Sequence, residues 1–264
     1  MPEIDIGGRP IIYDVQGTGE PIVFLHAGLA DRHMWDAQLA HFSASHRVIR
    51  YDQPGFGESP LPDDSVSYVD DLRQVMDALE IDKATLVGCS LGGMVSLEFA
   101  VNYPERVSRL VLVGSSIVGY KPSAPLPELW EKARQAYENK DYAGVTEIGV
   151  QLFVVGRGRA SEDVPDDLKA YVYKHYYASN FGQNARPEIT WPVRSAVEHL
   201  SEIDVPTLVI VGSLDTEQII EMANLLASSI PNAQKAIMEN TAHLPNMEQP
   251  DMFNEMLEDF FSQR

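Results

Sequence analysis

Ser90 stands at the centre of a Gly-x-Ser-x-Gly sequence, residues 88–92, a recurrent setting for a nucleophilic serine. Alone the pattern is weak evidence, because a chance match occurs in roughly one chain in ten of this length. Its context is stronger, since an apolar run at 84–87 precedes it and a helical pattern at 91–103 follows. So sharp a turn from strand to helix strains the serine, requires glycine two residues away, and raises the hydroxyl above a sheet. We therefore predict that Ser90 is a nucleophile.

A serine hydroxyl attacks only when a base takes its proton. Of the seven histidines, His243 is the predicted base, because it follows a short strand at 234–238 and precedes the last helix. The order serine, acid, histidine then places the acid after the preceding strand, 207–211, where Asp215 stands. Asp215 is expected to accept a hydrogen bond from His243, and Glu217 is the fallback. The alternative role of Asp215 is to cap the helix that begins near Glu217.

The oxyanion of a tetrahedral intermediate needs two backbone N–H donors. Leu91, directly after the serine, is one predicted donor. Gly28, in the loop after the apolar run 22–25, is the second, with Leu29 as the alternative. His26 in this loop is predicted to organise the loop rather than act as a base. Cys89 is predicted to be a small buried hydrophobic residue and not a nucleophile.

The elements that must position these residues alternate along the chain. Residues 4–6 and 11–15 flank Gly7-Gly8 and predict a β-hairpin at a sheet edge. Short apolar runs predict buried parallel strands, and amphipathic patterns between them predict helices at 69–79, 91–103, 219–226 and from Pro250 onward. The strands predicted in this way are 22–25, 48–51, 84–87, 110–113 and 207–211. This alternation indicates an α/β fold with a doubly wound, mostly parallel sheet.

Residues 117–200 interrupt the alternation with helical patterns and no convincing strand. Prolines mark its entry (Pro122, Pro125 and Pro127) and its exit (Pro187 and Pro192). We predict a helical insertion, or lid, between two strands, with residues 1–116 and 201–264 as the core. Its aromatic residues fit either packing between helices or an apolar or small neutral ligand.

Composition excludes several function classes. The 264 residues carry a net charge of −19, which argues against nucleic acid or an anionic membrane as a partner. Apolar runs are too short to cross a bilayer, and the acidic N-terminus lacks the features of a signal peptide. A single cysteine, Cys89, permits no internal disulfide, so we expect a cytoplasmic protein. No cofactor or metal is expected, and the oligomeric state is not readable.

The motifs together resemble the α/β-hydrolase superfamily over nearly the whole chain. Besides the serine motif, the resemblance rests on the turn at 26–28, the run 51–59 (YDQPGFGES) and the segments 211–215 and 242–248. Within the superfamily the chain is most similar to small lidded carboxylesterases and 3-oxoadipate enol-lactonases. The resemblance implies a serine hydrolase of a carboxylic ester or lactone, acting through Ser90, His243 and Asp215. It also implies that the turn at Tyr51-Asp52 shapes the core without catalysing.

Two departures and two alternatives accompany this resemblance. Relatives usually carry His-Gly where this chain has His26-Ala27, and a bulky residue where it has Gly28, so the second oxyanion donor stays open. Ala30 stands where peracid-forming relatives often carry proline, which disfavours that activity. The alternatives are hydrolysis of a carbon–carbon bond in a diketone-type substrate, with Lys174, Arg186 and Arg194 offered for a carboxylate, and a non-catalytic ligand-binding relative.

Overall fold

A mixed β-sheet forms the centre of the computed structural model, which describes residues 2–63, 65–121, 123, 128–182 and 187–263. Its strands are β1 (Glu3–Ile6), β2 (Arg9–Gln16), β3 (Pro21–Leu25), β4 (Arg47–Tyr51), β5 (Ala84–Cys89), β6 (Val107–Val113), β7 (Thr207–Gly212) and β8 (Ala233–Met238). They lie in the order β1-β2-β4-β3-β5-β6-β7-β8. β1 and β2 form the predicted antiparallel hairpin at one edge, and β4 to β8 run parallel with β3.

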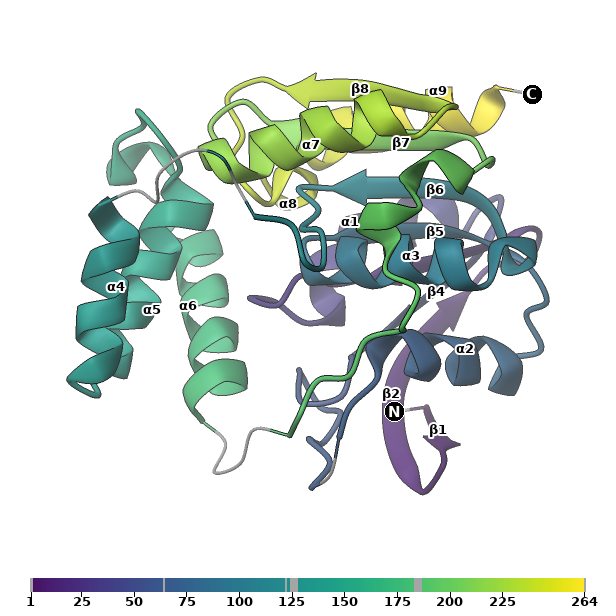
Figure 1. The fold of residues 1–264 in the computed structure, drawn as a ribbon, viewed down its shortest axis with the longest axis horizontal. Helices are drawn as coiled ribbons and strands as arrows, with labels where there is room; N and C mark the ends of the chain where they lie inside the picture. The colour runs from purple at the N-terminus through teal and green to yellow at the C-terminus, as the bar shows by residue number, and fades with distance from the viewer. Residues whose placement is uncertain (1, 64, 122, 124–127, 183–186, 264) are drawn as a thin grey trace.

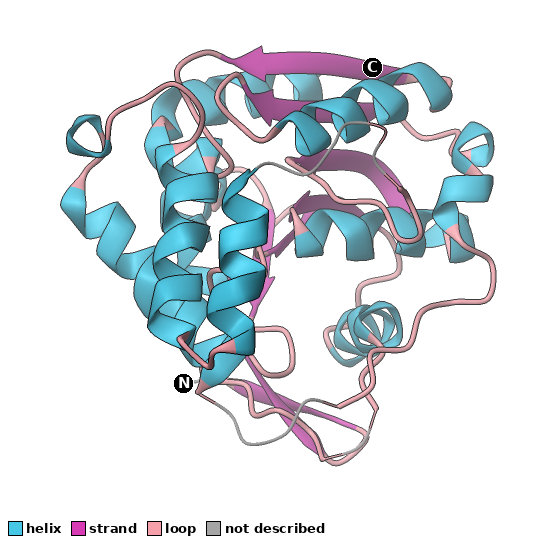
Figure 2. Ribbon diagram, turned by 60° about the vertical axis from the view of Figure 1, so that its left-hand side comes forward, coloured by secondary structure: helices cyan, strands magenta, loops and turns pink. Residues whose placement is uncertain are grey.

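Helices cover both faces of the sheet (Figure 2). They are α1 (Asp36–Phe42), α2 (Tyr68–Ala78), α3 (Leu91–Asn102), α7 (Glu217–Ser229), α8 (Pro245–Glu248) and α9 (Pro250–Ser262). On one face, Phe24 of β3, Phe42 of α1 and Phe253 of α9 belong to the same apolar cluster. On the other, α2, α3 and α7 pack against the sheet in a second apolar cluster. β5 and β7 are therefore buried along their whole length, and the predicted doubly wound α/β fold is confirmed.

The segment 117–200 lies between β6 and β7, and its described part combines helices with loops, one of which forms an isolated β-bridge between Ile189 and Val66. It contains α4 (Glu128–Glu138), α5 (Tyr142–Val150), a π-helix η3 (Gln151–Val155), α6 (Asp166–Phe181) and the short 3₁₀ turns η4 (Ser161–Asp163), η5 (Ala196–Glu198) and η6 (Leu200–Glu202). Figure 1 shows α4, α5 and α6 beside the end of the sheet to which the arrowheads of β6 and β8 point. Two further 3₁₀ turns, η1 (Arg32–Trp35) and η2 (Pro104–Arg106), belong to the rest of the chain.

Aromatic rings join the helices of this segment to one another. Tyr142 of α5 stacks on Phe181 of α6, with ring centroids 4.7 Å apart. This contact supports packing between helices as one use of the tyrosines. Pro122, Pro125, Pro127 and Arg186 lie outside the described residues. Nowhere in the described ranges is a helix both long and apolar enough to traverse a bilayer.

A buried glutamate ties α3 to the end of the segment. Both carboxylate oxygens of Glu98, which is 0% exposed, accept hydrogen bonds from the Ala196 N–H at 3.0–3.1 Å. Burial raises the pKa of Glu98 to about 7, although hydrogen bonds from Ala196 and Ser195 and the charge of His199 oppose the rise. The folded protein therefore holds a proton here that the unfolded chain has released.

We expect this proton to make stability fall with rising pH. The contribution of Glu98 is fully present below about pH 4.5 and is lost by about pH 7, because its pKa is higher in the folded state. One pKa unit corresponds to about 1.4 kcal/mol, so the whole change amounts to about 3 kcal/mol. Urea unfolding at several pH values should show this decline for the intact protein and a smaller one for Glu98→Gln. A difference between the two proteins that does not vary with pH would contradict the assignment.

Candidate active site

Ser90 occupies a strained turn between β5 and α3. Its φ of 52° and ψ of −107° lie in a region that side chains rarely adopt, and it is the N-cap of α3. A Cβ added to Gly88 would lie 2.2 Å from the carbonyl oxygen of Gly92, and one added to Gly92 would lie 2.2 Å from that of Leu25. The two glycines are therefore required by space, as the motif predicts. Ser90 itself is half-buried at the positive end of the helix dipole.

His243 and Asp215 form a buried pair. His243 Nδ1 and Asp215 Oδ2 are 2.7 Å apart, and the two side chains are 1% and 0% exposed. The other carboxylate oxygen of Asp215 accepts a hydrogen bond from the Thr216 N–H at 2.7 Å. The predicted contact between acid and histidine is thus present. A carboxylate in this position fixes the imidazole tautomer with Nδ1 protonated and Nε2 free to accept a proton.

The geometry agrees neither with Asp215 as a helix cap nor with Glu217 as the acid. The cap of α7 is Thr216, whose hydroxyl accepts the Ile219 N–H, so the capping alternative for Asp215 is wrong. Glu217, the fallback acid, is 66% exposed and pairs with Arg157 at 3.2 Å. The structure therefore brings Asp215, and not Glu217, to His243.

The end of β6 lies between Ser90 and the buried pair. The Ser90 N–H donates to the Val113 carbonyl at 2.9 Å, and Gly114 follows with a φ of 49°. A Cβ added to Gly114 would lie 3.1 Å from His243 Nδ1 and 3.3 Å from Asp215 Oδ2. Ser90 and the buried pair therefore both lie against the end of β6. No hydrogen bond joins the Ser90 hydroxyl to His243 within the described residues.

The two predicted oxyanion donors are also neighbours. Leu91 is the first residue of α3, where the N–H has no acceptor inside the helix. A Cβ added to Gly28 would lie 3.6 Å from the Leu91 Cβ. The Gly92 N–H donates to the His26 carbonyl at 3.1 Å, which ties the loop after β3 to the start of α3. Leu29, the alternative donor, has a buried side chain in the same turn.

His26 and Cys89 have the supporting roles that the sequence predicts. His26 Nε2 accepts the Gln53 N–H at 2.9 Å, and its Nδ1 lies 2.9 Å from the Ala27 carbonyl, so the ring is held between two loops. Burial lowers the pKa of His26, despite the opposing charge of Asp52. Burial also raises the pKa of the Cys89 thiol, which lies 3.7 Å from the His243 carbonyl. Neither residue is placed to act as base or nucleophile.

Phe153 is a neighbour of His243 that the sequence did not reveal. Its carbonyl accepts the His243 N–H at 3.1 Å, and the two rings lie 4.9 Å apart. Phe153 belongs to the π-helix η3, an irregularity often found at functional sites. Gly156 ends η3 with a φ of 77°, and a Cβ there would lie 2.7 Å from the Leu214 carbonyl and 2.8 Å from the Ala242 Cβ. The segment therefore touches both loops that carry the buried pair.

Two arginines after η3 extend this contact. Arg157 donates to the main-chain carbonyl of Asp215 at 2.5 Å. Arg159 pairs with the buried Glu248 at 2.7 Å, and Glu248 in turn accepts the Ala242 N–H, also at 2.7 Å. Arg159 thus supports the residue before His243, while Arg157 supports Asp215. Both arginines belong to the run Gly-Arg-Gly-Arg at 156–159, but this run does not indicate which distant residues they contact.

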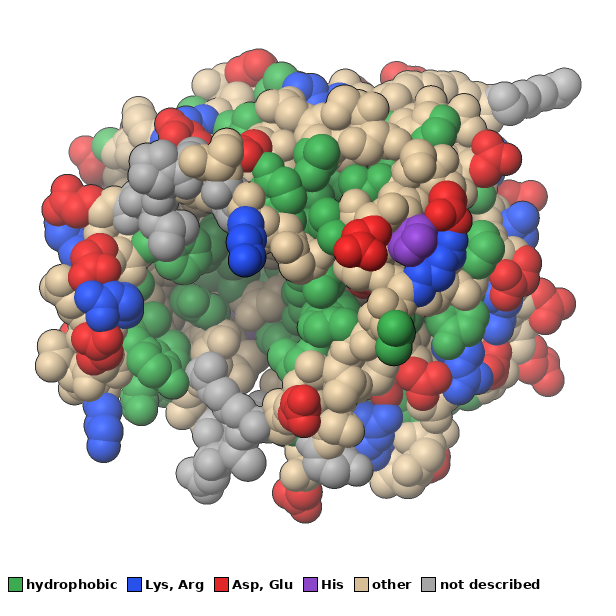
Figure 3. Space-filling model, viewed as in Figure 1, with side chains coloured by type: hydrophobic (Ala, Val, Ile, Leu, Met, Phe, Trp, Pro, Cys, Tyr) green, Lys and Arg blue, Asp and Glu red, His purple; other side chains and the backbone are tan. Residues whose placement is uncertain are grey.

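A hollow opens between this segment and the sheet. Figure 3 shows it in the view of Figure 1, with hydrophobic side chains on both of its walls. Such a cleft at the carboxyl ends of parallel strands is the usual place for a ligand in an open α/β sheet. Among the residues that the structure describes, no three histidine, cysteine or acidic side chains are grouped to hold a metal ion.

Comparison with known proteins agrees with this geometry. A sequence model of a protein family described as "alpha/beta hydrolase fold" matches residues 20–140. The chain is similar to a 2-hydroxy-6-oxononadienedioate/2-hydroxy-6-oxononatrienedioate hydrolase of Paraburkholderia phymatum, with 30% identity over 95% of this chain and 90% of the relative. It is also similar to a 2-hydroxy-6-oxo-6-phenylhexa-2,4-dienoate hydrolase of Comamonas testosteroni, with 29% identity over 100% and 95% of the two chains.

Among solved structures, the chain is similar to Est816, described as an N-acyl homoserine lactone degrading enzyme. The TM-score is 0.81 and the identity 30%, over 98% of this chain and 100% of Est816. Sheet order, serine turn and relatives agree, and the chain belongs to the α/β-hydrolase superfamily, whose fold and hydrolase character it shares.

Proposed function

We propose that the protein hydrolyses carboxylic esters or lactones through Ser90, His243 and Asp215. The observation that carries the proposal is the 2.7 Å hydrogen bond between His243 and Asp215, buried beside the strained turn of Ser90. Such a pair suits proton transfer from a serine hydroxyl, because the carboxylate stabilises the imidazolium that forms.

In the proposed reaction, Ser90 Oγ attacks the carbonyl carbon while His243 Nε2 takes its proton. The N–H groups of Leu91 and Gly28 stabilise the resulting oxyanion. His243 then protonates the leaving alkoxide, which departs and leaves an acyl-enzyme. Water, deprotonated by His243, attacks the acyl carbonyl and releases the acid and the free serine. In a lactone the alcohol stays attached to the acid, so ring opening gives one product.

Cleavage of a carbon–carbon bond is the second candidate, because two relatives near 30% identity are named for oxo-dienoate substrates. Those substrates are carboxylates, which call for a cation in the site. Arg194 is engaged with the Val101 carbonyl and Glu202, and Lys174 lines a cavity together with the acidic residues Asp31, Asp36 and Glu58. Together with the net charge of −19, this arrangement favours a neutral ester or lactone.

A substrate panel tests the proposal. We expect the purified protein to release p-nitrophenol from acetate, butyrate or octanoate esters, or to open an N-acyl homoserine lactone, with kcat/KM at least about 100-fold above that for an oxo-dienoate. The preferred acyl length would measure the acyl side of the cleft. The reverse preference would assign carbon–carbon cleavage. A ligand that raises the melting temperature without any turnover would assign a binding role.

We also propose which partners the protein has and where in the cell it acts. A small-molecule substrate needs no nucleic acid or membrane partner. The single cysteine, Cys89, is buried and unpaired, which suits the reducing cytoplasm that we propose as its location.

A further inference from the structure

Asp31 is a buried carboxylate at the end of the loop that carries the proposed second oxyanion donor. It is 4% exposed, and its Oδ1 accepts the His33 N–H at 2.9 Å to cap η1. A carboxylate removed from water is costly unless it is hydrogen-bonded and paired. Burial raises its pKa, but the Tyr171 hydroxyl and the charge of His175 outweigh burial and keep that pKa below its usual value. Asp31 is therefore an ionised group that depends on its partners.

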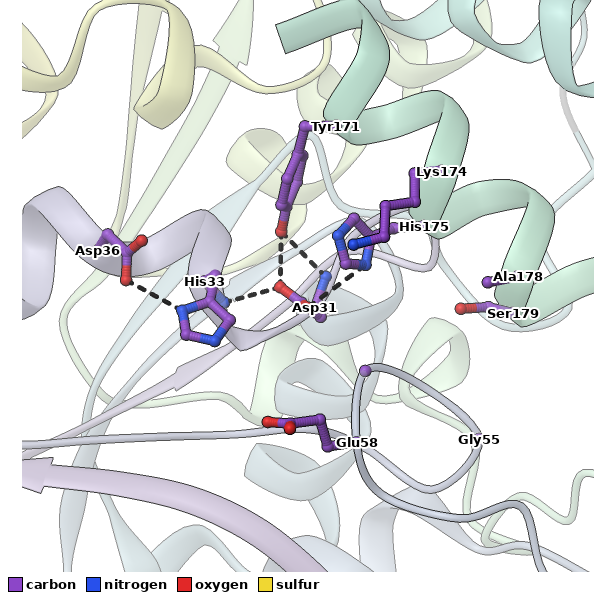
Figure 4. Close-up of a pocket in the computed structure, with 11 residues that line it drawn as sticks. Asp31, His33, Asp36, Gly55, Glu58, Tyr171, Lys174, His175, Ala178 and Ser179 are labelled. Carbon is purple, nitrogen blue, oxygen red and sulfur yellow. Dashed lines mark hydrogen bonds and ion pairs between the residues drawn. The ribbon is translucent and has the colours of Figure 1, made fainter. Parts of the chain in front are cut away.

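Those partners come from α6 (Figure 4). The Tyr171 hydroxyl donates to Asp31 Oδ1 at 2.7 Å and also accepts the Asp31 N–H at 3.3 Å. His175, one turn further along α6, places Nδ1 3.3 Å from Asp31 Oδ2, and its ring lies 4.4 Å from that of Tyr171. One tyrosine hydroxyl thus holds both the side chain and the main chain of residue 31.

A short turn connects Asp31 to Gly28. The Ala30 N–H donates to the Ala27 carbonyl at 3.1 Å, which links residue 31 to the turn that contains Gly28. At its other end the loop is fixed to α3 by the hydrogen bond from Gly92 to His26. A displacement of Asp31 would therefore be taken up between residues 27 and 31. Oxyanion donors act only within about 2.7–3.1 Å of the developing charge, so a small displacement there changes the rate.

A cavity lies beside this contact, although Leu168 and Val172 of α6 belong to the apolar core next to it. A cavity of about 670 Å³ separates α6 from the turn at 55–58, and Asp31, Tyr171 and His175 line it. The polar cluster thus forms a bridge between α6 and the loop at the margin of the cavity, next to the apolar core. Such a bridge transmits the position of α6 to the loop.

We propose that Tyr171 is a positioning residue, which through Asp31 sets the geometry of the oxyanion loop 27–31. The inference rests on the proposed function, because it assigns Gly28 to the oxyanion hole. It connects the helical segment 117–200 to transition-state stabilisation. Among the described residues, Tyr171 makes no hydrogen bond to Ser90, His243 or Asp215, so it acts through Asp31.

Tyr171→Phe tests the proposal, because it keeps the ring against His175 and removes only the hydroxyl. We expect kcat/KM for p-nitrophenyl butyrate to fall about 10- to 100-fold, the loss that a misplacement of up to 1 Å produces. A boronic acid, which adds to Ser90 and mimics the tetrahedral state, should lose affinity by a similar factor. Amide hydrogen exchange in residues 27–31 should become faster.

Two further variants control for packing and folding. Tyr173→Phe removes a hydroxyl from the same helix, where Tyr173 lines a different cavity beside Val150, and should match the intact protein. Asp31→Asn keeps an acceptor for Tyr171 and the cap of η1, and should retain more activity than Tyr171→Phe.

The outcomes separate this inference from the proposed function. Unchanged kcat/KM and unchanged exchange in Tyr171→Phe would overturn the inference while ester hydrolysis stands. A loss of kcat/KM without a loss of boronate affinity would overturn it as well. If the intact protein hydrolyses neither an ester nor a lactone, the proposed function fails, and unchanged exchange in residues 27–31 of Tyr171→Phe would then independently overturn the role of Tyr171.

Discussion

Ser90→Ala is expected to lower kcat for p-nitrophenyl butyrate by about 10⁶-fold, the size of the loss when a serine protease loses its nucleophile. Without the Ser90 hydroxyl no acyl-enzyme forms, and only binding and the oxyanion donors remain to assist attack by water. Alanine removes a single atom from a half-buried side chain, so the turn should keep its conformation. Steady-state release of p-nitrophenol, with circular dichroism as a check of folding, measures the effect.

Ser96→Ala is the matched control for this variant. Ser96 lies on α3, is fully buried and donates its hydroxyl to the Gly92 carbonyl at 2.8 Å. The substitution therefore removes one serine hydroxyl from the same helix without touching the proposed chemistry. We expect Ser96→Ala to keep nearly full activity. A fluorophosphonate probe should label the intact protein and Ser96→Ala but not Ser90→Ala. Equal losses in the two variants would assign the effect to the helix rather than to the nucleophile.

The sequence was sufficient for the parts of the site that follow strands. A parallel sheet brings the carboxyl ends of its strands to one edge, so the residues after 84–87, 207–211 and 234–238 had to meet there. Ser90, Asp215 and His243 stand at those ends, and the hydrogen bond between the last two is present. Local steric rules also predicted that Gly88 and Gly92 leave no space for a side chain.

The contacts that hold the proposed catalytic residues in place could not be predicted from the sequence, because they depend on how the segment 117–200 packs against the rest of the protein. Phe153 reaches His243, and Arg159 reaches Glu248, across distances along the chain that no periodicity encodes. The π-helix that presents Phe153 carries no recognised sequence signature. Polar pairs such as Tyr171 with Asp31 follow from the angle of α6, which packing sets. Helical character was predictable there, but the contacts were not.

Asp215→Asn is the second large effect that we expect, with kcat lowered by about 10⁴-fold. The amide has nearly the same shape, and its oxygen can still accept the Thr216 N–H, so the loop should keep its fold. Its NH₂ group, however, would face His243 Nδ1 as a donor where the carboxylate was an acceptor. The imidazole would then carry its proton on Nε2, and could not take the proton of Ser90. The loss should appear in kcat, with KM little changed.

Glu217→Gln is the matched control, because Glu217 is the neighbouring acid in the same loop. Its carboxylate is exposed and pairs with Arg157, so neutralising it changes the local charge as Asp215→Asn does but leaves His243 untouched. We expect activity within about threefold of the intact protein, since exposed ion pairs contribute little. If Glu217→Gln were the inactive variant and Asp215→Asn the active one, the buried contact with His243 would be structural. The acid of the reaction would then have to reach His243 by a movement of the loop.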